Sequence, residues 1–249
     1  MGAKARTVRG NKGGANLVEI SAQLSEEVSG LSFAEPVAYV YNPLAYAWDL
    51  HCQYLRRFGA ETKEVVFLGM NPGPWGMAQT GVPFGEVAAV RDWMKLSAEV
   101  KSPEREHPKR KIEGLTCKRS EVSGARLWGW AQERFASAEV FFEKHFVTNY
   151  CPLVFMAESA RNLTPDKLPA AERAVLGAAC DKAFVATIQT LKPKMVVGVG
   201  VYAEKQAARL CEGMDVEIGR ILHPSPASPV ANRGWAPQAE AQLQALGIL

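Results

Sequence analysis

Two polar side chains in this sequence each stand directly after an apolar run and inside a turn. Asn71 follows the run 65–68 and lies within the glycine- and proline-rich segment 69–74, and His223 follows the short run 220–222 and precedes a proline. Glycine and proline stop both strands and helices, so each side chain should be held on a tight turn at the end of a buried strand. Ligands bind at the carboxyl ends of strands in open α/β sheets. We therefore expect Asn71 and His223 to meet in one pocket.

An imidazole beside a carboxamide can assist the loss of an anionic leaving group. A neutral His223 can donate a hydrogen bond to a developing oxyanion, and such preorganised donors contribute about 3–4 kcal/mol in a water-excluded site. The amide oxygen of Asn71 can hold a water molecule but cannot take its proton as a carboxylate would. General-base assistance, often worth roughly 10²–10⁴-fold, should then be largely missing. Each residue alone also has a plainer interpretation, Asn71 as a turn residue before proline and His223 as a buried histidine bonded to the backbone.

The elements that would position these side chains alternate along the chain. Apolar runs predict strands, and amphipathic periodicity predicts helices between them. The expected strands are 65–68, 146–149, 195–200 and 216–222, and the expected helices are 16–28, 44–57, 86–96, 125–135, 170–191, 203–211 and 239–246. Strands separated by helices form parallel βαβ units, so we expect a three-layer α/β domain. Its strand ends would bring Asn149 to the same edge as Asn71 and His223.

Composition limits the class of protein. The 249 residues are 47% hydrophobic, which suits one domain with a substantial core, and no stretch is predicted to be long and apolar enough to span a bilayer. The formal net charge is only +3, with basic residues clustered near the N-terminus and in the polar surface segment 101–124. We expect residues 1–15 to form a basic, flexible tail and residues 16–249 to form a single α/β domain. Five scattered cysteines without a CxxC pair argue against a disulfide framework and a zinc ribbon.

Two long segments carry a family resemblance. The sequences GMNPGPWGMAQTGVPFGE, at 69–86, and HPSPASPVANRGW, at 223–235, resemble the signature motifs of the single-strand-selective monofunctional uracil-DNA glycosylases, within the uracil-DNA glycosylase superfamily. Segments 119–124 and 149–153 are similar to that family as well, and the resemblance covers roughly residues 35–249. It implies a four-stranded, mainly parallel sheet flanked by helices. It also implies a DNA repair enzyme that flips uracil out of single- or double-stranded DNA and hydrolyses its N-glycosidic bond, leaving an abasic site in an intact strand.

The resemblance assigns the chemistry to three side chains. His223 would donate a hydrogen bond to the uracil O2, and Asn71 would orient the water beneath C1′ of the sugar. Asn149 would read the Watson–Crick edge, because a carboxamide offers both a donor for O4 and an acceptor for N3–H. The 4-amino group of cytosine would then be mispaired, at about 1–3 kcal/mol per unmade buried bond.

The resemblance also places three residues around the base. Phe84 would be the stacking platform, and the backbone amide of Met70 would contact the base. Other members of the superfamily have a bulky aromatic residue near position 73, where this chain has Gly73. The glycine would leave room for a 5-substituent, so substrates should include 5-hydroxymethyluracil. Core packing for Phe84 and a backbone requirement for Gly73 remain the plainer interpretations.

The segment 224–234 is the candidate for filling the gap that a flipped base leaves in the duplex. The residues expected to contact DNA there are Ser225, Ala227, Ser228, Asn232 and Arg233. The amide and hydroxyl of Ser225 would grip a phosphate. The family usually has an arginine directly after PSP, where this chain has Ala227. We therefore expect duplex uracil to be processed less efficiently than in arginine-bearing relatives, unless Arg233 substitutes.

The expected ligands are limited to DNA. No lysine lies within either motif and no carboxylate or histidine cluster suggests a metal, so we expect no Schiff-base strand cleavage, no metal and no cofactor. The protein should act as a monomer on uracil-containing DNA, single- or double-stranded, inside the cell (cytoplasm or nucleoid if bacterial, nucleus if eukaryotic) and away from membranes.

Three other functions stay open at this point. The same fold could act on the deaminated purines hypoxanthine or xanthine. A non-catalytic binder of damaged DNA is a second class, although such a protein needs neither Asn71 nor His223. A nucleotide-phosphate enzyme is the weakest alternative, because the segment 69–73 matches neither GxxxxGKS/T nor GxGxxG.

Overall fold

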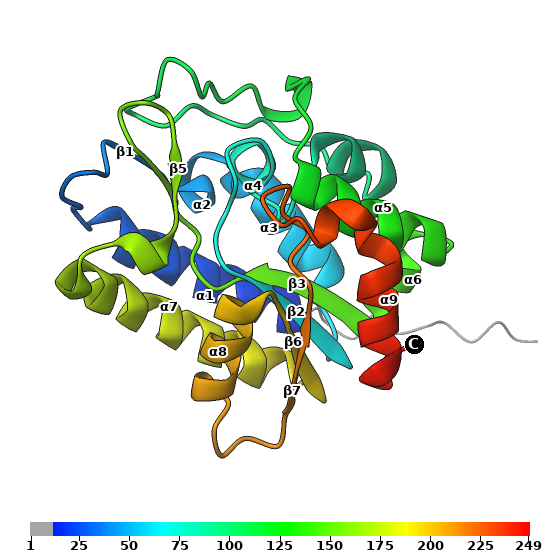
Figure 1. The fold of residues 1–249 in the computed structure, drawn as a ribbon. Coiled ribbons are helices and arrows are strands. Elements are labelled where there is room, and N and C mark those ends of the chain that lie inside the picture. The colour runs from blue at the N-terminus through cyan, green and yellow to red at the C-terminus, as the bar shows by residue number, and fades with distance from the viewer. Residues whose placement is uncertain (1–11) are drawn as a thin grey trace, which may run out of the picture.

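A four-stranded parallel sheet forms the centre of the molecule in this computed structural model, which describes residues 12–249 (Figure 1). Its strands are β3 (His145–Asn149), β2 (Val65–Gly69), β6 (Met195–Val199) and β7 (Glu217–Ile221), in that spatial order. All three neighbouring pairs are parallel, as predicted. Every residue of β2 and β6 is buried, which explains why these strands read as continuous apolar runs.

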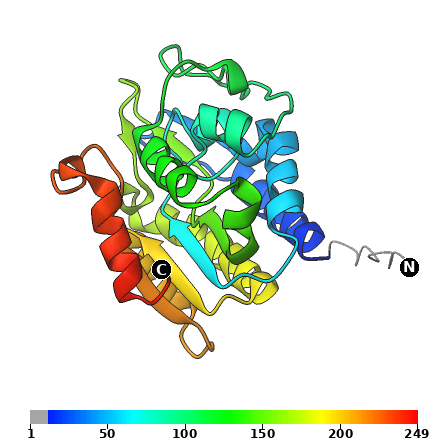
Figure 2. The same ribbon diagram turned by 90° about the vertical axis from the view of Figure 1, so that its right-hand side faces the viewer.

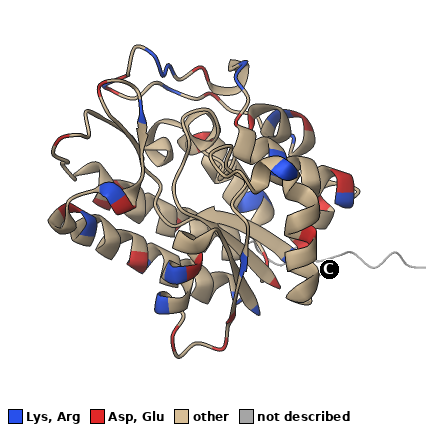
Figure 3. Ribbon diagram, in the orientation of Figure 1, with Lys and Arg blue, Asp and Glu red and all other residues tan. Residues whose placement is uncertain are grey.

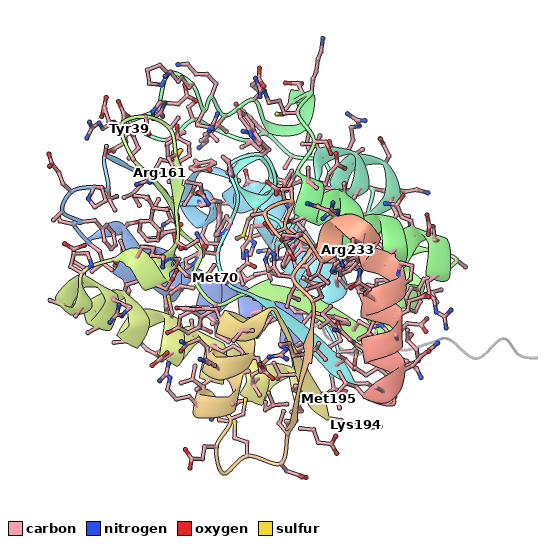
Figure 4. All side chains as sticks on the ribbon, in the orientation of Figure 1. Tyr39, Met70, Arg161, Lys194, Met195 and Arg233 are labelled. Atoms are coloured by element: carbon pink, nitrogen blue, oxygen red, sulfur yellow. The ribbon has the colours of Figure 1, made fainter. Side chains whose placement is uncertain are left out.

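The strand register determines which residues lie at the edge of the sheet that carries the polar side chains. Gly69, the last residue of β2, lies opposite Asn149, the last residue of β3. At the other side of the sheet, Val199 of β6 lies opposite Ile221 of β7, two residues before His223. Because the strands are parallel, the residues that follow them leave the sheet at one edge. Figure 4 shows Met70 at that edge and Lys194 and Met195 at the opposite one.

Helices cover both sides of the sheet and complete three layers, as predicted (Figures 1 and 2). They are α1 (Lys12–Ser29), α2 (Pro43–Tyr46), α3 (Trp48–Phe58), α4 (Met77–Thr80), α5 (Val122–Arg134), α6 (Ala138–Lys144), α7 (Ala170–Leu191), α8 (Val201–Leu210) and α9 (Trp235–Ala245). Helix α1 packs on α7 and α3, α8 on β6, and α9 on β7 and α5. One large cluster of buried apolar side chains extends from Leu17 on α1 to Leu243 on α9.

A second, smaller sheet was not predicted. It contains β1 (Tyr39–Tyr41), β4 (Val154–Met156) and β5 (Asn162–Leu163), which pair antiparallel in the order β1-β4-β5. Its strands have only two or three residues, too few for a periodic sequence pattern to reveal them. The hairpin of β4 and β5 brings Asn162 close to the edge of the central sheet that carries the polar residues.

Several element boundaries differ from the predicted ones. Helix α1 begins at Lys12 rather than at residue 16, so residues 12–15 of the predicted tail are helical, and the rest of that tail lies outside the described residues. Gly13 permits this start, because a Cβ there would lie 2.5 Å from the carbonyl oxygen of Ala60. The predicted helix 86–96 contains instead a π-helical turn, Ala89–Trp93, closed by a hydrogen bond from the Met94 amide to the Ala89 carbonyl at 2.9 Å.

Helix α7 corrects the expectation that no stretch is long and apolar enough to span a membrane. An 18-residue window of this 22-residue helix reaches a mean hydropathy of 1.2, and it is the one helix within residues 12–249 that meets such a criterion. About a third of that window is buried inside the protein, on a face that includes Leu176, Phe184 and Ile188. A single helix of this kind is weak evidence for a membrane span, since a helix that packs on a core has the same composition.

Candidate active site

A cavity of about 560 Å³ opens at the sheet edge where β2, β3 and β7 end. The predicted residues that line it are Met70, Asn71, Gly73, Phe84, Asn149, His223, Ser225, Ala227 and Ser228. The two proposed catalytic side chains and the predicted base-reading carboxamide are therefore brought to one place by three different strand ends. Asn232 and Arg233 do not line the cavity and lie in the short helical turn Ala231–Arg233; Figure 4 labels Arg233 beside α9.

The side chain of Asn71 is oriented by its amide nitrogen. Nδ2 donates to the Leu153 carbonyl at 3.1 Å and, more weakly, to the Pro72 carbonyl at 3.4 Å. These bonds leave the amide oxygen as an acceptor that makes no hydrogen bond within residues 12–249. A carboxamide fixed in this way can orient a water molecule but offers no base for its proton.

The imidazole of His223 is held in one tautomer. Its Nδ1 accepts a hydrogen bond from the Ser225 amide at 3.1 Å, so the proton of the neutral ring lies on Nε2, which can donate into the cavity. Burial lowers the pKa of His223 from its ordinary value and favours the neutral form. Gly200, with φ of 92°, lets the ring sit close to the end of β6, since a Cβ there would lie 3.1 Å from the His223 Cβ.

Asn149 presents an unused acceptor. Its Nδ2 contacts the Met77 sulfur at 3.4 Å, whereas its Oδ1 is buried and has no hydrogen-bond partner among residues 12–249. A buried acceptor without a partner costs about 1–3 kcal/mol, so its presence indicates a ligand that supplies the missing donor. Gly69 makes room for this side chain, because a Cβ on Gly69 would lie 2.2 Å from the Asn149 Oδ1 and 2.6 Å from the Phe84 ring.

Phe84 is fixed in an unusual backbone conformation. Its φ is 53°, in a region that non-glycine residues rarely adopt. The Trp128 indole nitrogen donates to its carbonyl at 3.0 Å, and Gly124 packs against the same carbonyl. The ring is half-buried at the cavity, with its centroid 6.2 Å from that of His223. Strain held by surrounding contacts at a cavity wall is typical of a functional residue.

A carboxylate that sequence reasoning did not assign, Glu121, also lines the cavity. It lies against Gly73, where a Cβ would come within 2.6 Å of its Oε2, and against Gly76. Backbone amides of Trp75 and Ser123 donate to the carboxylate, while burial has the larger effect and raises its pKa. Glu121 belongs to the segment 119–124 of the resemblance, so its position was visible in the sequence but its role was not.

The 224–234 loop is braced from inside the protein. Arg126, on α5, donates to the Pro224 carbonyl at 3.0 Å and to the Asn232 Oδ1 at 2.9 Å. The Asn232 Nδ2 donates to the Pro226 carbonyl at 2.9 Å. The Asn232 side chain therefore stabilises the loop, a role that its polarity alone did not predict. Arg126 had no sequence signal beyond its place on an expected helix.

Ser225 corrects one expectation. Its amide already donates to His223, and its Oγ accepts a hydrogen bond from the Ala227 amide at 3.1 Å. The backbone amide of Ser225 is thus not available to a phosphate, contrary to the prediction. Its hydroxyl hydrogen remains a donor at the cavity wall.

Further lining residues that sequence reasoning missed come from the loops between elements. They are Pro72, Pro74, Met77, Ser123, Asn162, Thr164 and Pro226. Asn162 and Thr164 reach the cavity through the unpredicted small sheet. Residues 12–249 contain no group of His, Cys, Asp or Glu side chains arranged to hold a metal ion, and the five cysteines are buried free thiols.

Comparison with known proteins gives one family. The model of the uracil DNA glycosylase superfamily matches residues 56–244. A single-strand selective monofunctional uracil-DNA glycosylase of Rattus norvegicus is 51% identical over 234 residues, which cover 93% of this chain and 84% of the relative. The Mus musculus protein of the same description is 50% identical over the same length and coverage.

A solved structure agrees with the fold. The crystal structure of wild-type Pedobacter heparinus SMUG2 is similar with a TM-score of 0.62, over 92% of this chain and 97% of that one. Sequence identity between the two is only 16%, so this likeness concerns the backbone architecture.

Proposed function

This chain belongs to the uracil DNA glycosylase superfamily, and we propose from that membership that it is a monofunctional uracil-DNA glycosylase of DNA repair. It removes uracil from DNA by hydrolysing the N-glycosidic bond and leaves an abasic site. The observation that carries the assignment to this cavity is the buried Oδ1 of Asn149, which has no hydrogen-bond partner within residues 12–249 and lines the same cavity as Asn71 and His223. That acceptor is suited to the N3–H of uracil, a donor that cytosine lacks at the same position.

Bond cleavage in this proposal depends on two side chains. The His223 Nε2–H donates to the uracil O2 as negative charge develops there, because the Ser225 amide keeps the proton on that nitrogen. The amide oxygen of Asn71 orients a water molecule beneath C1′, since its nitrogen is already bonded to Leu153. Without a carboxylate at position 71, the sugar becomes oxocarbenium-like before water adds.

Recognition of the base extends to its 5-position. Phe84 stacks on the flipped uracil, the Met70 amide contacts it, and the absence of a side chain at Gly73 lets the Glu121 carboxylate approach on the side of the 5-carbon. Glu121 also lines the cavity, and its carboxylate can accept a hydrogen bond from the hydroxyl of 5-hydroxymethyluracil. We therefore include this modified base among the substrates.

DNA is bound as a single or double strand by one copy of the chain, within the cell. The Ser225 hydroxyl, Ala227, Ser228 and the exposed Arg233 face the strand around the flipped nucleotide, and Asn232 keeps their loop in shape. Ala227 is too short to fill the space left in a duplex by an extruded base, so the single strand is the better substrate.

Release of base from labelled oligonucleotides tests the function. Each oligonucleotide contains one uracil, as a single strand or opposite guanine or adenine, and strand breaks should appear only after hot alkali. We expect His223→Ala and Asn149→Ala to lose most of this activity, because each removes a hydrogen bond to uracil. Asn16→Ala is the matched control, since Asn16 is exposed on α1 and does not line the cavity. Full activity in both cavity variants, or none in the wild type on any uracil substrate, would contradict the proposal.

A further inference from the structure

Trp75, the residue after the cavity-lining Pro74, has two arginines over its ring. The guanidinium carbon of Arg110 is 5.0 Å from the centre of the Trp75 ring, and that of Arg119 is 4.8 Å from it. Trp75 directly follows Pro74, which lines the cavity, and its backbone amide donates to the cavity carboxylate Glu121. The group Arg110–Trp75–Arg119, called the arginine stack below, is therefore joined to the wall of the active-site cavity.

Neither arginine of the stack is neutralised. Among residues 12–249, no ion pair involves Arg110 or Arg119, whereas neighbouring Lys111 is paired with Glu106 at 2.7 Å and Arg91 with Asp92 at 2.7 Å. The Arg110 Nη1 donates to the Lys109 carbonyl, 3.2 Å away, and the buried Nε has no hydrogen-bond partner in the described part of the chain. Two like charges held on one ring repel each other, and an indole contributes only about 0.5–1 kcal/mol to each at an exposed site. A bound anion would neutralise these two charges and relieve their repulsion.

The geometry favours a phosphate as that anion. The exposed Arg119 guanidinium lies over the ring and presents a planar N–H fork that matches the oxygens of a phosphate. In Arg110, Nη1 bonds the Lys109 carbonyl and Nε is buried, so Nη2 is the group that it can offer. The exposed Lys109 and Lys118 flank the stack in sequence, and the ribbon of Figure 3 marks several basic positions along the loop that runs across the top of that view. A strand whose target nucleotide enters the cavity must cross its rim. Nucleic acid thus fits the position of the stack better than an acidic protein segment does.

We propose that the arginine stack binds backbone phosphates of the DNA strand that carries the target nucleotide, next to the flipped position. The inference builds on the proposed function, because that function gives the strand its path. The contact uses the damaged strand alone, so it serves a single strand as well as a duplex. It differs in this respect from the 224–234 loop, whose suggested role of filling a gap requires two strands.

Salt dependence of DNA binding provides the test. The probe is a single-stranded, uracil-free 20-mer with a fluorescent label, and its dissociation constant is measured by anisotropy at several salt concentrations for the wild type, Arg110→Gln and Arg119→Gln. Each phosphate contact on a single strand contributes about 0.7 to the slope of log K against log salt. We expect each variant to lower the slope by about that amount and to weaken binding about threefold to tenfold at moderate salt. Arg119→Lys, which keeps the charge but loses the fork, should weaken binding less than Arg119→Gln.

Arg105→Gln is the matched control. Arg105 belongs to the same segment and also stacks on an aromatic ring, 4.5 Å from the centre of Tyr39, but Tyr39 is part of the small sheet and does not line the cavity. This variant removes one charge and one ring contact without touching the arginine stack. Slopes in Arg110→Gln and Arg119→Gln that equal the slope of Arg105→Gln would overturn the proposal.

Base release separates this inference from the proposed function. With uracil-containing single strands, the stack variants should raise KM and leave kcat near the wild-type value, because the stack does not touch the base. A fall in kcat with unchanged salt slopes would overturn phosphate binding and show that the stack only supports Glu121. A reduced slope in a protein that releases no base from any uracil substrate would refute the proposed function and leave the phosphate site standing.

Discussion

At the scale of single residues, the site depends on contacts that fix the orientation and the hydrogen-bonding role of each polar group. The Ser225 amide fixes the proton of His223 on Nε2, and the Leu153 carbonyl holds the Asn71 side chain by its nitrogen. Within residues 12–249, the Oδ1 of Asn149 accepts no hydrogen bond. Each of these constraints comes from a backbone group or a missing Cβ. The residue types could therefore be predicted from the sequence, whereas their orientation could not.

Protonation of His223 should set the acid limit of activity. Burial lowers its pKa, so the neutral imidazole persists as pH falls through the ordinary histidine range. Protonation would place a second donor against the Ser225 amide and break the bond that orients the ring. We expect kcat/KM on a uracil-containing single strand to stay flat from pH 8 to about 6.5, the ordinary histidine pKa, and to fall only below it. A decline centred above that value would contradict this assignment.

Glycine at position 69 should be essential for base release. A Cβ at this position would overlap the Asn149 Oδ1 at 2.2 Å and the Phe84 ring at 2.6 Å, so Gly69→Ala must displace one of them. We expect base release to fall by about 10²-fold or more, the order lost when one such hydrogen bond is misplaced. Gly129→Ala is the control, because a Cβ there meets nothing within 4 Å. Near wild-type rates in Gly69→Ala would show that neither neighbour is needed where it stands.

At the scale of elements, two strand-end turns and one braced loop build the cavity. The turn after β2 was predictable because glycine and proline follow a buried strand directly. The brace was not, since Arg126 on α5 lies 98 positions before Pro224, the carbonyl of which it binds. Sequence periodicity reveals which residues share a helix face, but it carries no record of such distant partners. For the same reason, the small antiparallel sheet and the position of Glu121 against Gly73 could not be predicted from the sequence.

Loss of the Arg126 brace should loosen the 224–234 loop. Arg126→Ala removes the hydrogen bonds to Pro224 and to Asn232, and Arg126→Lys restores the charge without the two-pronged geometry. We expect Arg126→Ala to lower kcat about tenfold, through a misplaced His223, and to speed amide hydrogen exchange in residues 224–234. Unaltered exchange together with unaltered kcat would show that the loop holds its shape alone.

The residue at position 227 should control the preference between single and double strands. Ala227 lines the cavity but its side chain ends at Cβ, so it cannot occupy the space that an extruded base leaves. We expect Ala227→Arg to raise kcat/KM on U:G and U:A duplexes severalfold and to change single-strand rates little. Ala227→Gln, which is longer than alanine but shorter than arginine and uncharged, helps to separate gap filling from added charge. Duplex rates that do not respond to either substitution would exclude this position as the wedge.

At the scale of the whole molecule, four parallel strand ends and a ring of loops place the chemistry on one edge, while the stability of the fold depends on buried groups elsewhere. The neutral His51 imidazole joins α3 to the turn after α4 and to α1, through the Gly81 carbonyl at 2.7 Å and the Ser21 hydroxyl at 3.1 Å. Burial lowers the pKa of His51 from 6.5 to about 4. The charged form is thus excluded from the folded core across most of the mildly acidic range.

Acid should therefore destabilise the fold before the carboxylates titrate. A folded-state pKa below the unfolded value means that the unfolded chain binds the proton more readily, so stability is complete above pH 6.5 and is lost as pH falls towards 4. At about 1.4 kcal/mol per pKa unit, this one group would cost roughly 3 kcal/mol over that interval.

Urea unfolding at pH 7.5 and pH 4.5 measures the difference in the free energy of unfolding. The lowered pKa values of His145 and His223 add to that difference in the same direction. His51→Gln cannot take up a proton, so its free energy of unfolding should change less between the two pH values than that of the wild type. Equal changes in the two proteins would show that another group controls the acid limit of the fold.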